Sequence, residues 1–291
     1  MQSAIEVTQL NKSFAEKSVL NDLSFSIPKG SVVGILGNNG AGKTTLIQTL
    51  IGLLKSNSGK CKVFDDVSPE LSAETKHKIG YVPQEAELLP WMKVYQMIDY
   101  SKSFYDQWDN ELVSRLINEW HIDEKQIIEN MSVGQKQKLA IILAVGHSPE
   151  LLILDEPVAS LDPSTRRNFI KELIDMNLDK GNTIIFSTHI TSDLERVAAD
   201  VLLMKDGRSY YHGEIDDLKE RFVKLYIKSE IELPLNFSVP SMIRRQRIGG
   251  HQMILVEDLS QVSLEQIKQE YQAEITIEQL SLEDIFVEVH S

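Results

Sequence analysis

The clearest signals in the sequence are two continuous apolar runs, each of strand length. The first, Ser31 to Leu36, leads into a glycine-rich loop that spans Gly37 to Thr45. Apolar residues then recur at the spacing of a helix, at Leu46, Ile47, Leu50 and Ile51. The second run, Leu151 to Leu154, is followed by two carboxylates. Because continuous apolar strands are typical of parallel sheets that are buried on both faces, the pattern predicts an α/β fold.

The rest of the pattern divides the chain into regions. Antiparallel strands are predicted over residues 3 to 27, and helices over about 85 to 149. Further strands are predicted at 60–64, 79–82, 183–187 and in a hairpin at 201–212. The last region has short alternating segments at 224–228, 253–256 and 274–277, and helices near 264–271 and from Ser281. We predict one domain at 1–213, with a helical subdomain at about 85–149, and a small α+β domain at 214–291.

Composition limits the class of protein. With 42% hydrophobic residues among 291, the chain is long and apolar enough to bury a sizeable core. The longest apolar runs, such as Leu139 to Val145, are far shorter than the roughly 18 to 20 residues that cross a bilayer. The first residues alternate like a strand and lack the features of a signal peptide. We therefore expect neither a membrane span nor secretion.

The net charge and the cysteine content limit the kinds of partner and the cellular compartment that we expect. A net charge of −13 argues against a nucleic-acid partner and against direct insertion into anionic lipid. The lone Cys61 cannot form an internal disulfide, which fits a reducing cytoplasm. The seven histidines are scattered without metal-ligand spacing, so no structural metal is predicted.

The glycine-rich loop has the chemistry of a triphosphate site. Gly37, Gly40 and Gly42 allow a tight turn whose backbone N–H groups approach phosphate closely. Lys43 is expected to reach the β- and γ-phosphates, and the Thr44 hydroxyl to bind Mg²⁺. The helix that begins there adds the positive end of its dipole.

Polar residues after the later strands suggest catalysis. Asp155 would hold Mg²⁺ through water, and Glu156 would orient and deprotonate an attacking water. His189 follows the strand at 183–187 and could bond the γ-phosphate, although an isolated surface histidine is the simpler interpretation. Ser132 and Gln135 form a predicted capping box, which by itself indicates only a well-capped helix.

Aromatic residues leave two interpretations open. All three tryptophans, Trp91, Trp108 and Trp120, fall in the helical region, where they would build a thin core, line a groove for a partner helix, or do both. Phe14, in the loop of the first antiparallel sheet, would either stack on adenine or pack locally.

Taken together, these motifs resemble the nucleotide-binding subunits of ABC transporters over about residues 3 to 220. The motifs occur in the family's order and approximate spacing: Gly37–Thr45, Gln84, Ser132–Gln135, Leu151–Pro157, Ser160–Asp162 and His189. The ending, with its serine cap and acidic turn from Ser281, resembles ATPase subunits of bacterial ABC-2-type exporters of drugs, antimicrobial peptides and lipids.

The resemblance implies a P-loop NTPase core and assigns roles by position. It implies that Phe14 stacks on adenine, that Gln84 senses Mg²⁺ and the membrane subunit, and that His189 is the switch histidine. The implied ATP-binding residues are Phe14, Gly37, Asn38, Asn39, Gly40, Ala41, Gly42, Lys43, Thr44, Thr45 and Gln84. The implied metal site is formed by Thr44, Gln84 and Asp155, and the implied catalytic residues are Glu156, His189 and Lys43.

Partners follow from the same resemblance. Two ATPase subunits would face head to tail, and the signature residues Ser132, Val133, Gly134 and Gln135 would contact the γ-phosphate of the opposite subunit. An integral membrane permease would hold the protein at the inner face of the cell membrane. Met131 and Val133 depart from the usual Leu-Ser-Gly-Gly-Gln, which leaves a heterodimer open beside a homodimer. A soluble ATPase of this fold without a transport role, or a regulatory subunit with weakened hydrolysis, are the alternative functions.

Overall fold

The structure is a computed structural model, and it describes residues 2–158, 161–231, 233–248 and 251–290. The chain folds into two units, the first ending at His212 and the second beginning at Gly213. Ser160, a residue of one predicted motif, lies outside the described residues. Within the described ranges, no helix is long and apolar enough to span a membrane.

The first unit contains an antiparallel sheet, a mainly parallel sheet and two groups of helices. Its strands are β1 (Ser3–Phe14), β2 (Lys17–Pro28), β3 (Val32–Leu36), β4 (Ser58–Val63), β5 (Asp66–Val67), β6 (Ile79–Val82), β7 (Leu151–Asp155), β8 (Thr183–Thr188), β9 (Asp200–Lys205) and β10 (Arg208–Glu214). Its helices are α1 (Lys43–Leu50), α2 (Ala73–His77), α3 (Val94–Lys102), α4 (Asn110–Glu119), a 3₁₀ turn (Ile128–Asn130), α5 (Val133–Val145), α6 (Pro163–Lys180) and α7 (Thr191–Val197).

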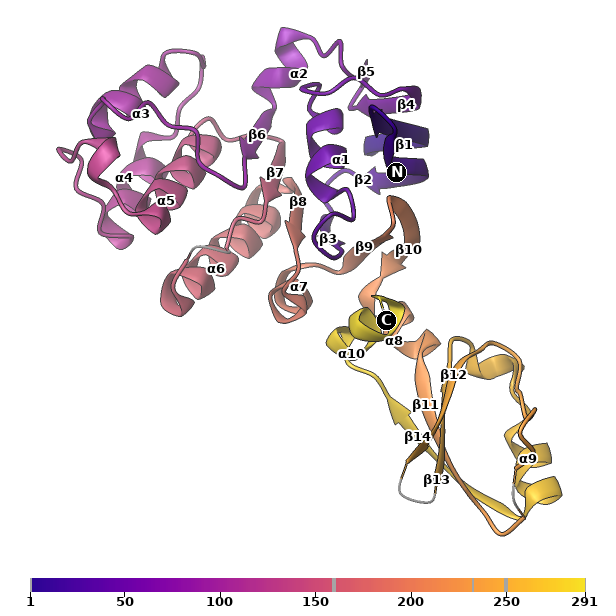
Figure 1. Cartoon of the computed structure of the whole chain (residues 1–291). Coiled ribbons are helices and arrows are strands. Elements are labelled where there is room, and N and C mark those ends of the chain that lie inside the picture. The colour runs from indigo at the N-terminus through magenta and orange to yellow at the C-terminus, as the bar shows by residue number, and fades with distance from the viewer. Residues whose placement is uncertain (1, 159–160, 232, 249–250, 291) are drawn as a thin grey trace. The chain divides into compact units, whose positions relative to one another are not determined.

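The two sheets carry the strands that the sequence predicted. The antiparallel sheet has the order β2-β1-β4-β5, and the larger sheet has the order β10-β9-β3-β8-β7-β6 (Figure 1). In the larger sheet β3 lies parallel between β8 and β9, and β7 lies parallel between β6 and β8. The predicted α/β class is confirmed. Since parallel strands end at one edge, the residues that follow β3, β7 and β8 are brought together there.

Helix α1 is enclosed in the main core of the unit. Its Leu46, Ile47 and Leu50 are fully buried in one cluster with residues of both sheets, such as Ile5 of β1 and Ile153 of β7. Each such side chain contributes about 1.5–3 kcal/mol by leaving water. This packing fixes the axis of α1, and therefore the direction in which its first turn points.

The opposite face of the larger sheet is covered by α6 and α7. At Gly34, in β3, an added Cβ would collide with the side chain of Leu194 in α7, so a larger residue there would force Leu194 to shift. Helix α6 begins at an Asp162 cap followed by Pro163, and it ends at Gly181 with φ +66°. The start and stop that the sequence indicated are therefore confirmed.

The helices α3, α4 and α5 form the helical region between β6 and β7 (Figure 1). Of its tryptophans, Trp120 is buried and packs edge-on against Phe169, Trp108 is half-buried, and Trp91 is 69% exposed. The core interpretation therefore holds for Trp120 and in part for Trp108, which packs against Tyr105 and Gly146. Several large aromatic side chains are left at the surface, namely Trp91, Tyr95, Tyr100 and Phe104.

The second unit is a four-stranded antiparallel sheet with helices. Its elements are α8 (Ile215–Arg221), β11 (Val223–Ser229), β12 (Met242–Ile248), β13 (His251–Val256), a 3₁₀ turn (Leu259–Gln261), α9 (Leu264–Tyr271), β14 (Ala273–Gln279) and α10 (Leu282–His290). The strand order is β12-β13-β11-β14. Glu288 of α10 forms ion pairs with Lys224 (3.6 Å) and Arg244, which attach the last helix to the sheet. The sequence did not predict β12 or α8.

Candidate active site

The first turn of α1 is free to bind an anion. Gly42 is its N-cap, and no side chain caps the helix or places an acidic group in its first turn. Gly42 has φ +100°, and a Cβ there would lie 2.9 Å from the carbonyl oxygen of Val19. Only glycine therefore permits this turn so close to β2. The N–H groups of an uncapped helix N-terminus are a ready site for phosphate.

Lys43 is buried and carries the positive charge of the loop. Its Nζ donates to the carbonyl oxygen of Gly37 at 2.7 Å, and it lies 3.2 Å from Oε1 of Glu156. Lys43 is 6% exposed and Glu156 is 7% exposed. Because the two charges are paired away from water, their attraction is stronger than at a surface.

The two carboxylates at the end of β7, Asp155 and Glu156, are fixed by one hydroxyl group. The Ser187 Oγ donates to Oδ1 of Asp155 at 2.5 Å and accepts the N–H of Glu156 at 2.9 Å. Asp155 is fully buried, and its Oδ2 has no hydrogen-bond partner among the described residues. A buried carboxylate oxygen without a donor is costly unless a cation or water satisfies it. This atom therefore fits a cation site.

Glu156 has an unusual backbone conformation, and its carboxylate contacts two basic side chains. Its φ is +49°, a left-handed conformation that is uncommon for a residue with a side chain and clusters at functional sites. Its Oε2 lies 2.8 Å from Nδ1 of His189, which follows β8. The carboxylate is thus held between Lys43 and His189 at the end of the parallel strands.

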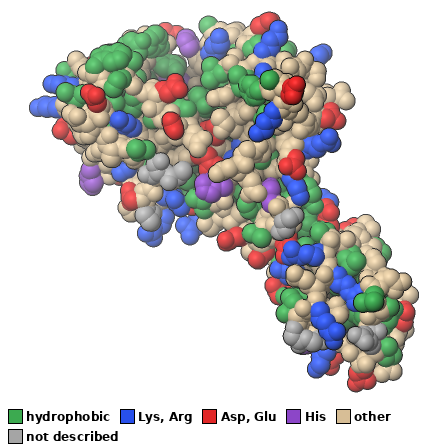
Figure 2. Space-filling view, viewed as in Figure 1, with side chains coloured by type: hydrophobic (Ala, Val, Ile, Leu, Met, Phe, Trp, Pro, Cys, Tyr) green, Lys and Arg blue, Asp and Glu red, His purple; other side chains and the backbone are tan. Residues whose placement is uncertain are grey.

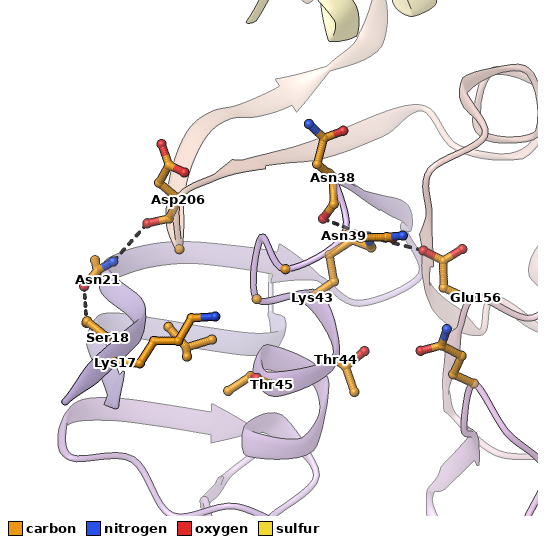
Figure 3. Close-up of a pocket in the computed structure, with 15 residues that line it drawn as sticks. Lys17, Ser18, Asn21, Asn38, Asn39, Lys43, Thr44, Thr45, Glu156 and Asp206 are labelled. Atoms are coloured by element: carbon orange, nitrogen blue, oxygen red, sulfur yellow. Dashed lines mark hydrogen bonds and ion pairs between the residues drawn. The ribbon is translucent and has the colours of Figure 1, made fainter. Parts of the chain in front are cut away.

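Lys43 and Glu156 border a pocket of about 590 Å³, whose lining does not include Asp155 or His189 (Figure 3). It is lined by Lys17, Ser18, Val19, Asn21, Asn38, Asn39, Gly40, Gly42, Lys43, Thr44, Thr45, Gln84, Glu156, Asp206 and Gly207. Gly37 and Ala41, which were predicted to bind ATP, support the loop from behind. The Gly37 carbonyl accepts from Lys43, and the buried Ala41 donates its N–H to the Asn38 carbonyl at 3.0 Å.

Sequence reasoning missed one wall of this pocket and the hydroxyl behind it. The wall is formed by Lys17, Ser18 and Asn21 of β2 with the Asp206–Gly207 turn, where Asn21 Nδ2 donates to the Asp206 carbonyl at 2.9 Å. The sequence offered one signal for this wall, namely that Lys17, Ser18 and Asn21 lie close to Phe14, the expected adenine-binding residue. Ser187 was missed because it lies within the strand predicted at 183–187, where a serine gives no sign of a functional role.

Phe14 is the last residue of β1, at the hairpin tip, where a loop had been predicted. Its side chain is 46% exposed, and the ammonium of Lys12 lies 4.8 Å from the ring centroid. Phe14 pairs in register with Lys17, which lines the pocket, although Phe14 itself does not line it.

The signature segment lies at the surface, outside the pocket that this chain forms. Ser132 caps α5, since its Oγ accepts the N–H of Gln135 at 3.2 Å, and Oε1 of Gln135 accepts the N–H of Ser132 at 2.9 Å. The predicted capping box is confirmed. Ser132 is exposed and Val133 is 70% exposed, so both can be reached by another molecule.

Negative charge near the site also acts on Tyr81 of β6. Burial, together with the nearby carboxylates of Asp155 and Glu87, raises the pKa of Tyr81 to about 12. The phenol therefore stays neutral at physiological pH.

A glycine loop at a helix N-terminus, a buried lysine, and carboxylates at the ends of parallel strands define a P-loop nucleoside triphosphatase. The family model described as "ABC transporter" matches residues 20–159. The ABC transporter ATP-binding protein YhaQ of Bacillus subtilis is 30% identical over 98% of this chain and 97% of its own length. Nod factor export ATP-binding protein I of Bradyrhizobium diazoefficiens is 30% identical over 76% of this chain and 73% of its own.

A solved ATP-binding subunit of an ABC transporter gives a TM-score of 0.69 at 26% identity, covering 75% of this chain and 92% of that chain. The chain belongs to the ATP-binding proteins of ABC transporters. It is the ATPase subunit of such a transporter, and it binds and hydrolyses ATP.

Proposed function

We propose that this ATPase powers an exporter of drugs, peptides or lipids through separate membrane subunits. The observation that carries the ATPase chemistry is the convergence of Lys43, Asp155, Glu156 and His189 at one edge of the larger sheet. The export role is supported by the relative that is named for Nod factor export.

The chain's own residues fit Mg²⁺. The unpartnered Oδ2 of Asp155 would face the ion through water, while the Thr44 hydroxyl and the Gln84 amide oxygen line the adjacent pocket. Oxygen ligands of this kind are those that Mg²⁺ prefers. When bound, Mg²⁺ would neutralise charge on the β- and γ-phosphates.

We assign water activation to Glu156. Its carboxylate is held by Nδ1 of His189. The other ring nitrogen, Nε2, would then be available to contact the γ-phosphate. Lys43 would exchange Glu156 for phosphate oxygens when ATP binds, since both compete for the same ammonium. That exchange would release the carboxylate to accept a proton from water.

The second half of the site would come from another ATPase subunit, identical or related. Among the described residues that line this chain's pocket, none is an arginine. The exposed, serine-capped start of α5 offers an N-terminal helix dipole that could stabilise the charge of the γ-phosphate in trans. Ser132, Val133, Gly134 and Gln135 would provide these contacts.

The surface of the helical region would bind the permease. Exposed aromatic residues around α3 form an apolar patch that Figure 2 shows as green side chains at the upper left, with Trp91, Tyr95, Tyr100 and Phe104 among the exposed ones. Beside it lies a pocket of about 330 Å³ with Tyr81, Phe104, Tyr105 and His147 among its lining. Aromatic anchors and a groove are typical of a site for a short helix. This contact would hold the protein at the inner face of the membrane.

Fractionation of cells that contain the natural partners tests this proposal. The protein should sediment with membranes, and an integral membrane protein should copurify with it after mild detergent extraction. A Tyr100→Ala/Phe104→Ala variant should remain folded and keep its basal ATPase activity, yet move to the soluble fraction. Membrane association that is unchanged in the double variant would exclude this surface as the permease site.

A further inference from the structure

The pocket has a phosphate end and a hairpin end. Each end carries a lysine, but so far only Lys43, at the phosphate end, has been given a role. At the phosphate end, Lys43, Thr44 and Thr45 belong to the first turn of α1. At the hairpin end, β2 contributes Lys17, whose side chain extends toward α1 in the direction of Thr45 (Figure 3). Any group that joins a base at the hairpin to phosphates at α1 must pass along this wall.

The ammonium of Lys17 is unpaired among the residues that the structure describes. Within the part of the chain that the structure describes, no ion pair or hydrogen bond joins it to another residue. Asp206 lines the same pocket but lies outside ion-pair distance of Lys17, and its carbonyl is occupied by Asn21. Lys43, in contrast, is paired with Glu156. Lys17 therefore contributes an uncompensated positive charge to the pocket wall.

The hairpin that carries Lys17 is held in place. Phe14 and Lys17 are cross-strand partners at its tip. Behind it, Nζ of Lys12 donates to the Lys55 carbonyl at 2.8 Å, and the N–H of Ser13 donates to Oδ1 of Asn57 at 2.7 Å. These bonds fix the strand ends relative to the loop that follows α1. The position from which Lys17 reaches into the pocket is thus built into the fold.

We propose that Lys17 binds the α-phosphate of the nucleotide and makes the hairpin end of the site selective for phosphorylated nucleosides. The inference rests on the proposed nucleotide pocket. With the β- and γ-phosphates at Lys43 and the base at the hairpin, the α-phosphate lies between them, where Lys17 points. A charge-assisted bond from an ammonium to a phosphate oxygen is stronger than a neutral one, but solvent exposure weakens it.

The test compares ligands that differ only in their phosphates. Lys17→Met keeps the length and apolar stem of the side chain and removes its charge, and Lys17→Arg restores the charge. Lys62→Met is the matched control, because Lys62 is a strand lysine of the same sheet whose partner is Glu6 at 3.7 Å, away from the pocket. Displacement of radiolabelled ADP by ADP, AMP and adenosine gives the three affinities for each variant of the full chain.

Lys17→Met should weaken the binding of ADP and of AMP five- to tenfold, where tenfold corresponds to about 1.4 kcal/mol. The affinity for adenosine should change less than twofold. The loss should shrink as salt is added, because salt screens an exposed charge. Steady-state kinetics should show a raised KM for ATP with kcat unchanged. Lys17→Arg should recover most of the affinity, and Lys62→Met should match the parent protein.

Two results would overturn the proposal. Unchanged affinity for ADP and AMP would mean that Lys17 does not touch phosphate. An equal loss for adenosine would mean that Lys17 acts on the base or on the hairpin. If the parent protein itself failed to bind ADP in this assay, the pocket assignment would fall, which is a different outcome from a normal parent with an unaffected Lys17→Met.

Discussion

Substitution of Glu156 by glutamine should separate ATP binding from ATP hydrolysis. The change keeps the size of the side chain and removes the charge that pairs with Lys43 at 3.2 Å. An amide oxygen can still accept from Nδ1 of His189, so the side chain should stay in place. The hydrolysis rate should fall by about 10²–10⁴, the usual contribution of a general base.

Binding should change in the opposite direction. At an effective dielectric constant of about 20, charges 3.2 Å apart attract by about 5 kcal/mol before the cost of desolvating them is subtracted. Lys43 loses this attraction in Glu156→Gln and then has no carboxylate to exchange for phosphate. If about 1.4 kcal/mol of this attraction remains after desolvation, ATP should bind Glu156→Gln roughly tenfold more tightly than it binds the parent protein.

The assays are single-turnover hydrolysis and equilibrium binding of ATP, each with Mg²⁺ present. Size-exclusion chromatography with ATP should also show more dimer, because the bound nucleotide is not consumed. Glu150→Gln is a suitable control, since Glu150 is an exposed carboxylate that precedes β7 and lies 3.9 Å from Lys78. Hydrolysis by Glu156→Gln at the parental rate would refute its role as the base.

Four further changes test neighbouring parts of the argument. Lys43→Ala should weaken ATP binding at least 100-fold in calorimetry, because it removes the buried cation of the phosphate loop. Asp155→Asn should raise the Mg²⁺ concentration for half-maximal hydrolysis about tenfold, with ATP binding measured without metal unchanged. Ser132→Arg should leave ATP binding by the monomer intact and abolish hydrolysis, since the exposed signature would no longer fit a partner subunit. Burial lowers the pKa of His147 to about 4, so the folded state holds this ring in its neutral form. As pH falls from 6.5 toward 4, the unfolded chain gains a proton that the folded one does not, and roughly 3 kcal/mol of folding stability should be lost. His147→Phe, which can keep the stack on Tyr105, should flatten the dependence of Tm on pH.

The sequence predicted those parts of the fold that local pattern determines. The strand before Gly37, the capping box at Ser132 and the start of α6 at Asp162 each depend on a few adjacent residues, and each is found where it was expected. Strand β12 was missed because Arg244, Arg245 and Arg247 interrupt its alternation. Arg244 is explained only by an ion pair to Glu288, about forty positions later.

The pocket wall shows the same difference between local and distant information. Asn21 and Asp206 are separated by 185 positions, yet a hydrogen bond joins them beside the nucleotide pocket. No motif links these residues, because their contact depends on how the folded chain places the turn at Gly207 beside β2. The N–H of Asn21 also donates to the Gly207 carbonyl at 2.8 Å, so the wall is held by two bonds across the fold.

The geometry of the two carboxylates is set by the register of the sheet. Asp155 and Ser187 are direct partners in the parallel pairing of β7 with β8, which places the serine hydroxyl between the side chain of Asp155 and the backbone of Glu156. One hydroxyl therefore fixes the expected metal ligand and the expected base relative to each other. Because buried strands resist displacement, this spacing does not depend on flexible loops. The left-handed turn at Glu156 then directs its carboxylate to Lys43 and His189, and the strained conformation is held by the contacts around it.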